Sequence, residues 1–196
     1  MTPALILDRD GVINRDTGYL YRMEEVEFID GTFETCRVFQ ELGFRIVIVT
    51  NQSGIARGYY TERDFNALMV WMRQCFEANR IRLAGVYYCP HHPAADMAAY
   101  AVACACRKPN PGMITRAALE LGLDLAQSIL VGDKLSDLEA GRRAGMGKVV
   151  LVRSGQSLAS DLERLADEVL DSLGDTAGLL KVAQSLNAAA TENEGL

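Results

Sequence analysis

The sequence lacks any long hydrophobic run. Its 196 residues are 49% hydrophobic and 23% charged, as in ordinary globular proteins, and no stretch of about 18 or more apolar residues could cross a bilayer. The start of the chain also lacks the basic region, apolar stretch and small-residue cleavage site of a secretion signal. We therefore expect a cytoplasmic protein with a single domain at 1–186 and a flexible tail at 187–196.

The sequence has no excess of basic residues: acidic residues outnumber basic ones, 26 to 20. The net charge of −6 argues against a partner bound mainly through a phosphate backbone, because such a partner requires a basic face. We expect no nucleic-acid or membrane partner and a monomeric protein. The number of cysteines, five, is odd, and the start of the chain shows no secretion signal. Both observations argue against a disulfide framework.

Short apolar runs rich in β-branched residues alternate with longer amphipathic segments, a pattern typical of βαβ units and a parallel sheet. The predicted strands are 4–7, 45–50, 85–88, 128–132 and 148–152, with a weaker strand at 168–170. The predicted helices are 32–42, 61–79, 111–121, 136–144 and 176–186. We predict a Rossmann-like three-layer α/β/α fold with a mainly parallel central sheet and no large cap domain.

The ends of the predicted helices support these ranges. Thr61 and Ser136 are candidate N-caps, and Gly43, Gly122 and Gly145 stand where a left-handed residue would close a helix. Ligands bind beyond the carboxyl ends of the strands in open α/β sheets. The two segments outside the βαβ pattern, 14–30 and 89–108, are therefore expected to shape a site.

Two carboxylates follow the first predicted strand. Side chains alternate along a strand, so Asp8 and Asp10 leave its end on the same side, and Gly11 allows the backbone to turn. Carboxylates so close raise each other's pKa unless a cation lies between them. The pair suits Mg²⁺ beside one nucleophile and one acid/base, whereas the alternative is an ordinary strand end with two solvated acids.

Other predicted strand ends decide between these alternatives. Thr50 and the backbone amides after it could bind a phosphoryl oxygen, although a strand threonine alone more often satisfies a neighbouring carbonyl. Asp133 follows the fourth strand and would complete a magnesium site, with Asp137 in an outer position. Arg107 and Lys108 precede a helix and could balance a phosphoryl group in transfer, unless they form a solvated surface pair.

The spacing of three cysteines predicts a structural zinc site. Cys89, Cys104 and Cys106 with one histidine make a closed tetrahedral set of ligands. Zinc bound there would hold the loop 89–106 in place, because a segment of this size cannot build a hydrophobic core of its own. His91 and His92 compete for the fourth position, and the Cys-x-His spacing favours His91. The remaining cysteines lie in helical patterns and are interpreted as core residues.

From Leu5 to Val152 the chain resembles the haloacid dehalogenase-like phosphatases, because Asp8, Asp10, Thr50, Lys108 and Asp133 follow the order and strand-end context of their four motifs. The resemblance implies that Asp8 attacks phosphorus to form an aspartyl phosphate, and that Asp10 acts first as an acid and then as a base. It also implies that Thr50 and Lys108 bind phosphoryl oxygens. Mg²⁺ would be held by Asp8, Asp133 and the backbone carbonyl of Asp10.

Within these phosphatases, the catalytic motifs together with the Cys-Pro-His-His-Pro and Cys-x-Cys-Arg-Lys-Pro segments resemble the heptose-1,7-bisphosphate 7-phosphatase family. That family removes the 7-phosphate of a bacterial sugar bisphosphate on the way to nucleotide-activated heptose for lipopolysaccharide. The resemblance implies a set of residues that bind or recognise the substrate: Asp16, Thr17, Gly18, Tyr19, Asn51, Gln52, Ser53, Arg107 and Lys134.

The main alternative is a histidinol-phosphate phosphatase, a family with a similar zinc loop and the same four motifs. A bisphosphate needs a cation far from Asp8, for which Arg107 and Arg57 are candidates, whereas histidinol would need an acidic or aromatic pocket. A second alternative is a zinc-stabilised interaction module without activity. That module would predict damage at the catalytic positions, and none of them is damaged.

Overall fold

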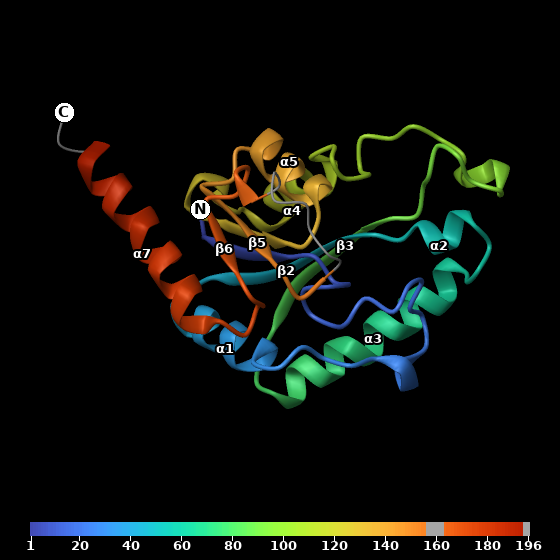
Figure 1. Ribbon diagram of the computed structural model, residues 1–196, viewed down its shortest axis with the longest axis horizontal. Helices are drawn as coiled ribbons and strands as arrows, with labels where there is room; N and C mark the ends of the chain where they lie inside the picture. Colours follow the sequence, from blue (N-terminus) through green and yellow to red (C-terminus); the bar gives the residue numbers. More distant parts are fainter. Residues whose placement is uncertain (156–162, 194–196) are drawn as a thin grey trace.

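A single parallel sheet organises the computed structural model, which describes residues 1–155 and 163–193 (Figure 1). The strand order is β3-β2-β1-β4-β5-β6, and every neighbouring pair is parallel. The strands are β1 Ala4–Leu7, β2 Arg45–Asn51, β3 Leu83–Cys89, β4 Ile129–Gly132, β5 Lys148–Val152 and β6 Glu168–Leu170. All six predicted strands are confirmed, and the sheet is parallel throughout.

Helices cover both faces of the sheet, which confirms the three-layer prediction (Figure 1). One layer holds α1 Thr32–Glu41, α3 Glu62–Ala78 and α7 Thr176–Asn193, and the other holds α4 Gly112–Leu121 and α5 Leu135–Ala144. A short α2, Ser53–Ala56, and the 3₁₀ turns η1 Met23–Glu25, η2 Ala98–Tyr100 and η3 Leu125–Gln127 lie in the connections. Alternation along β1 explains both cores, because Leu5 and Leu7 pack into the first layer whereas Ala4 and Ile6 pack into the second.

The predicted helix ends are mostly correct. Thr61 forms a capping box with Asp64 at the start of α3, and the backbone of Gly122 and Gly145 is left-handed directly after α4 and α5. Ser136 was the wrong choice of N-cap, because α5 begins at Leu135. The carboxylate of Asp137 accepts the first free N–H, that of Lys134, at 3.0 Å.

The C-terminal helix is longer than predicted, since α7 continues beyond 186 to Asn193. Residues 194–196 lie outside the described part of the chain, so the flexible tail and the domain limits remain predictions. Within the described residues, no helix is both long and apolar enough to span a membrane.

The sheet order positions the candidate site. Because all strands run in the same direction, the residues that follow β1, β2 and β4 meet at one edge of the sheet. β1 lies between β2 and β4, so Asp8 is flanked by Thr50 on one side and Asp133 on the other. Cys89, the last residue of β3, begins the loop 89–106 that is predicted to bind zinc, hereafter the zinc loop.

Candidate active site

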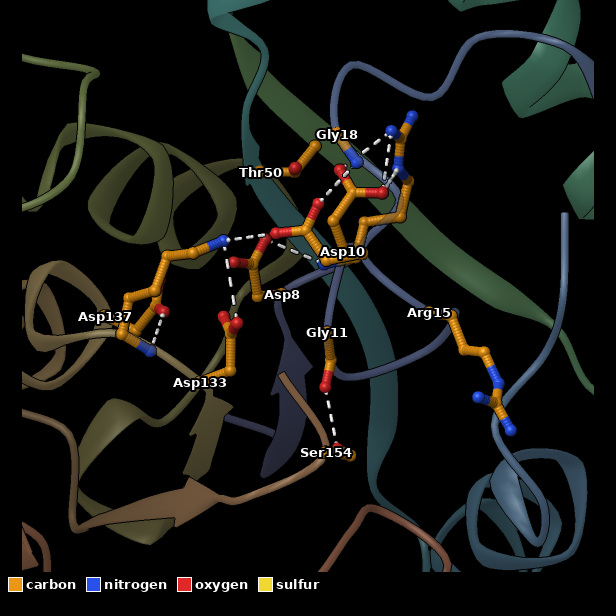
Figure 2. Close-up of polar contacts among 12 residues, drawn as sticks. Asp8, Asp10, Gly11, Arg15, Gly18, Thr50, Asp133, Asp137 and Ser154 are labelled. Atoms are coloured by element: carbon orange, nitrogen blue, oxygen red, sulfur yellow. Dashed lines mark hydrogen bonds and ion pairs between the residues drawn. The ribbon is translucent and has the colours of Figure 1, made fainter. Parts of the chain in front are cut away.

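Three buried carboxylates, Asp8, Asp133 and Asp137, gather at the carboxyl edge of the sheet (Figure 2), together with the buried ammonium of Lys108. Oxygen atoms of Asp8, Asp133 and Asp137 all lie within 4.8 Å of one another. The Nζ atom of Lys108 lies 3.0 Å from Asp8 Oδ1 and 2.6 Å from Asp137 Oδ1, and it donates to the carbonyl of Val49 at 2.9 Å. One lysine therefore bridges the predicted nucleophile and the predicted outer carboxylate.

Burial dominates the electrostatics of this group. It raises the pKa of Asp8, and it raises the pKa of Asp133 to about 7 with help from the charge of Asp8. Burial alone would lower the pKa of Lys108, but the charges of Asp137 and Asp8 outweigh it and raise that pKa. Lys108 stays charged, and the three acids still outnumber the buried cation.

Asp133 is shaped for a divalent cation. Its side chain is fully buried, and neither carboxylate oxygen has a hydrogen-bond partner among the described residues, although Lys134 Nζ lies 3.5 Å from Oδ2. A Cβ atom at Gly11 or Gly155 would lie only 2.3 or 2.0 Å from that same oxygen. Buried carboxylate oxygens without donors are costly unless a cation binds them, so Asp8 and Asp133 fit Mg²⁺, which prefers oxygen ligands.

Asp10, the predicted acid/base, is held by a buried arginine (Figure 2). Arg9 is fully buried. Its Nε and Nη2 atoms donate hydrogen bonds to Asp10 Oδ1 at 3.1 and 2.9 Å. Nη2 also donates to Asp10 Oδ2 at 2.7 Å. Asn14 donates to Oδ1 at 3.0 Å. Neither Arg9 nor Asn14 is predicted from the sequence as a site residue. The only hint was a charged residue directly between the two acids.

Gln52 connects Asp10, the predicted acid/base, to Thr50, the predicted phosphoryl ligand. Its Nε2 atom donates to Thr50 Oγ1 at 2.8 Å and to Asp10 Oδ2 at 3.2 Å, and its Oε1 atom accepts the hydroxyl of Tyr60 at 2.6 Å. Only 2% of Gln52 is exposed. Its side chain, predicted to bind substrate, is thus engaged with catalytic groups, and sequence reasoning did not find Tyr60.

A cavity of about 260 Å³ opens beside these groups and contains most of the predicted substrate residues. Lys134 Nζ, at its wall, lies 3.0 Å from Asp16 Oδ2, and the Tyr19 ring packs edge-on against that of Tyr59 with centroids 4.6 Å apart. The predicted residues that line the cavity are Asp10, Asp16, Gly18, Tyr19, Asn51, Gln52, Ser53 and Lys134.

Two predicted substrate residues do not line this cavity. Thr17 is exposed on the loop beside it. Arg107 is half-buried and donates from Nη1 to the carbonyl of His91 at 3.1 Å, which fixes its side chain to the zinc loop. Arg107 therefore lies where the zinc loop meets the catalytic lysine next to it in the chain.

The predicted zinc ligands converge. The Sγ atom of Cys106 lies 3.1 Å from that of Cys89 and 3.2 Å from that of Cys104, and Cys89 and Cys104 are 3.5 Å apart. His91 Nδ1 completes the group, at 3.5 Å from Cys106 Sγ. His92 lies outside it, because its Nδ1 accepts the N–H of Ala94. Three thiols and one imidazole form a donor set typical of structural zinc.

Comparisons with known proteins agree with this geometry. A family model described as HAD-hydrolase-like matches residues 105–176. The chain is 46% identical over 179 residues to the D-glycero-beta-D-manno-heptose-1,7-bisphosphate 7-phosphatase of Yersinia pestis, covering 91% of this chain and 95% of that protein.

Two solved structures are similar to the whole fold. A putative HAD-like phosphatase from Mesorhizobium loti has a TM-score of 0.82 and 35% identity, covering 94% of this chain and 87% of that one. The D,D-heptose 1,7-bisphosphate phosphatase of B. bronchiseptica, solved with magnesium and phosphate, has a TM-score of 0.76 and 30% identity, covering 92% and 99%.

Proposed function

Because this chain belongs to the haloacid dehalogenase-like phosphatases, in the family of the heptose-1,7-bisphosphate 7-phosphatases, we propose that it hydrolyses the 7-phosphate of D-glycero-D-manno-heptose 1,7-bisphosphate. The product serves the synthesis of nucleotide-activated heptose for lipopolysaccharide. The observation that carries this proposal is the buried group of Asp8, Asp133 and Lys108, which lies at the same edge of the sheet as a cavity lined by Asp10 and most of the predicted substrate residues.

Asp8 is the nucleophile in this proposal. One of its oxygens attacks phosphorus, the bond between phosphorus and the sugar oxygen breaks, and an aspartyl phosphate forms. Lys108, 3.0 Å from Asp8 Oδ1, balances charge on the phosphoryl oxygens during the transfer, and the hydroxyl of Thr50 donates a hydrogen bond to one of them. A carboxylate nucleophile divides one difficult displacement into two easier steps.

Asp10 moves the protons. It gives a proton to the departing sugar oxygen in the first step, and its carboxylate then takes a proton from the water that attacks the aspartyl phosphate. Phosphate leaves and Asp8 is restored. Arg9, Asn14 and Gln52 orient the Asp10 carboxyl, whose side chain remains 18% exposed toward the cavity.

Two metals complete the proposal. Mg²⁺, bound by Asp8, Asp133 and the carbonyl of Asp10, would neutralise charge on the phosphoryl group. Zn²⁺, bound by Cys89, His91, Cys104 and Cys106, would hold the loop that presents Arg107 toward the far end of the substrate. The relatives' name specifies the beta anomer, and we propose the same preference for this chain.

A phosphate-release screen with Mg²⁺ tests the function. The substrates are both anomers of the heptose bisphosphate, fructose 1,6-bisphosphate, histidinol phosphate and a 3′-phosphorylated oligonucleotide. We expect the highest kcat/KM for the beta-heptose bisphosphate. A higher kcat/KM for histidinol phosphate would contradict the proposed substrate, whereas release from no substrate would contradict the activity itself.

A further inference from the structure

The catalytic lysine comes from a connection rather than from a regular element. Lys108 lies between the last zinc ligand, Cys106, and the start of α4 at Gly112. Neither a helix nor a strand therefore provides partners for its backbone N–H and C=O groups. The side chain is nevertheless buried, with only 2% of it exposed.

One side chain supplies both missing partners. The N–H of Lys108 donates to Asn51 Oδ1 at 3.0 Å, and Asn51 Nδ2 donates to the C=O of Lys108 at 3.0 Å. The two residues are 57 positions apart in the chain. In the described part of the chain, these backbone groups of Lys108 have no other hydrogen bond.

Residues at the end of β2 thus hold both the backbone and the ammonium group of Lys108. The carbonyl of Val49 accepts a hydrogen bond from Nζ at 2.9 Å, while Asn51, two residues later, fixes the backbone. Between them stands Thr50, the predicted phosphoryl ligand. The positions of the hydroxyl and of the ammonium around the phosphoryl group are therefore both set by the last three residues of one strand.

We propose that Asn51 is a positioning residue, whose carboxamide sets the place of Lys108 instead of recognising the sugar. The inference rests on the proposed phosphatase activity and changes the role predicted for Asn51. Asparagine suits the task because its side chain offers a donor and an acceptor side by side, which matches the N–H and C=O of a single residue. Aspartate has no donor, and the longer glutamine side chain would shift the lysine.

The position of the ammonium matters for the rate. A displacement of about 1 Å in a catalytic group can cost on the order of 10²-fold in rate, and Lys108 carries several rotatable bonds between its backbone and Nζ. Its charge acts on the phosphoryl group, which every substrate of the enzyme shares. Loss of the Asn51 contacts should therefore weaken phosphate binding and affect all phosphate monoesters alike.

The test compares Asn51→Ala with Asn110→Ala as a matched control. Asn110 lies in the same connection, and its Nδ2 donates to the carbonyl of Cys104 at 2.8 Å without touching Lys108. The affinity for inorganic phosphate is measured by titration calorimetry with Mg²⁺ and Zn²⁺ present. The kcat/KM values are measured for the heptose bisphosphate and for p-nitrophenyl phosphate.

We expect Asn51→Ala to raise the Kd of phosphate about tenfold or more, as the loss of about 1.4 kcal/mol of binding would, and to lower both kcat/KM values by a similar factor. Asn110→Ala should change neither quantity. An unchanged Kd with a loss confined to the heptose bisphosphate would show direct sugar recognition and overturn the proposal. An unchanged Kd together with an unchanged kcat/KM for p-nitrophenyl phosphate would show that Asn51 does not position Lys108 and would also overturn the proposal.

The phosphate titration also separates this inference from the proposed function. If the wild-type protein does not hydrolyse the heptose bisphosphate, the proposed substrate is wrong. The effect of Asn51→Ala on phosphate binding can still be measured in that case, because the titration requires no turnover.

Discussion

At the scale of single residues, Asp8 has the most demanding role in the proposed mechanism, in which its carboxylate forms the covalent bond to phosphorus. Asp8→Asn removes the attacking oxygen and keeps the shape of the side chain. We expect turnover to fall below detection while the circular dichroism spectrum stays that of the wild type. Turnover near the wild-type level would exclude Asp8 as the nucleophile.

Asp10 contributes a proton rather than a bond, so its loss should be less complete. Asp10→Asn keeps a side chain that Arg9 and Asn14 can still contact but removes the exchangeable proton. We expect kcat to fall on the order of 10²-fold or more, as is usual for the loss of general acid/base catalysis. Steady-state assays measure this, and a change of less than about threefold would remove Asp10 from the mechanism.

Prediction from the sequence was limited at this scale by contacts between distant segments. The acids after β1 and β4 could be predicted because strand alternation and the parallel sheet place them at one edge. The hydrogen bonds of Asn51 and Gln52 could not, because their partners depend on where the zinc loop and Tyr60 fold back. Arg9 was missed because nothing local indicates a fully buried guanidinium.

At the scale of elements, we predict that the loop from Cys89 to Cys106 depends on a bound zinc ion. Its only regular element in the described chain is the 3₁₀ turn η2, so few backbone hydrogen bonds hold it in place. We expect about one zinc per chain by elemental analysis, and we expect Cys104→Ser to lose both the zinc and thermal stability, because structural zinc supplies folding free energy.

Cys75→Ser is the matched control for the zinc site, since Cys75 lies in α3 and outside the ligand group. It should retain the metal, as should His92→Ala, whereas His91→Ala should lose it. Protein purified without chelators that contains no zinc would refute the ligand assignment.

The helix ends show where a single residue type predicts a boundary and where two neighbouring residues are equally good candidates for a cap. Glycine after α4 and α5 was predicted correctly because the left-handed backbone there favours glycine strongly. At the start of α5, Ser136 and Asp137 can both cap a helix, and sequence alone does not rank them. The structure uses Asp137, which simultaneously meets Lys108.

At the scale of the whole molecule, the sheet concentrates negative charge in its interior. Three buried carboxylates lie together at one edge, and Lys108 pairs with two of them, Asp8 and Asp137. The excess of negative charge has a consequence for the third, Asp133. Burial and the charge of Asp8 raise the pKa of Asp133 from 3.8 to about 7. Between these two pH values the folded protein keeps a proton that the unfolded chain has already released.

Stability without magnesium should therefore fall as the pH rises from about 4 to about 7, because the folded state binds more protons than the unfolded state over that range. The contribution of Asp133 is complete below about pH 4 and is lost above its folded pKa. It amounts to at most about 4 kcal/mol, since one pKa unit corresponds to about 1.4 kcal/mol. Mg²⁺ replaces the proton, so added magnesium should stabilise the protein more at pH 8 than at pH 5.5.

Urea unfolding of the wild type and of Asp133→Asn, in magnesium-free buffer at pH 5.5 and pH 8, isolates this effect. Groups far from Asp133 titrate equally in both proteins, so the difference between them reports on Asp133 and on the neighbouring charges coupled to it. At pH 8 the variant should be the more stable protein, although inactive, because a neutral amide replaces a buried charge that lacks its cation. Equal pH dependence in the two proteins would mean that the pKa of Asp133 is not raised in the folded state. No added stabilisation of the wild type by magnesium would mean that Asp133 does not bind the metal.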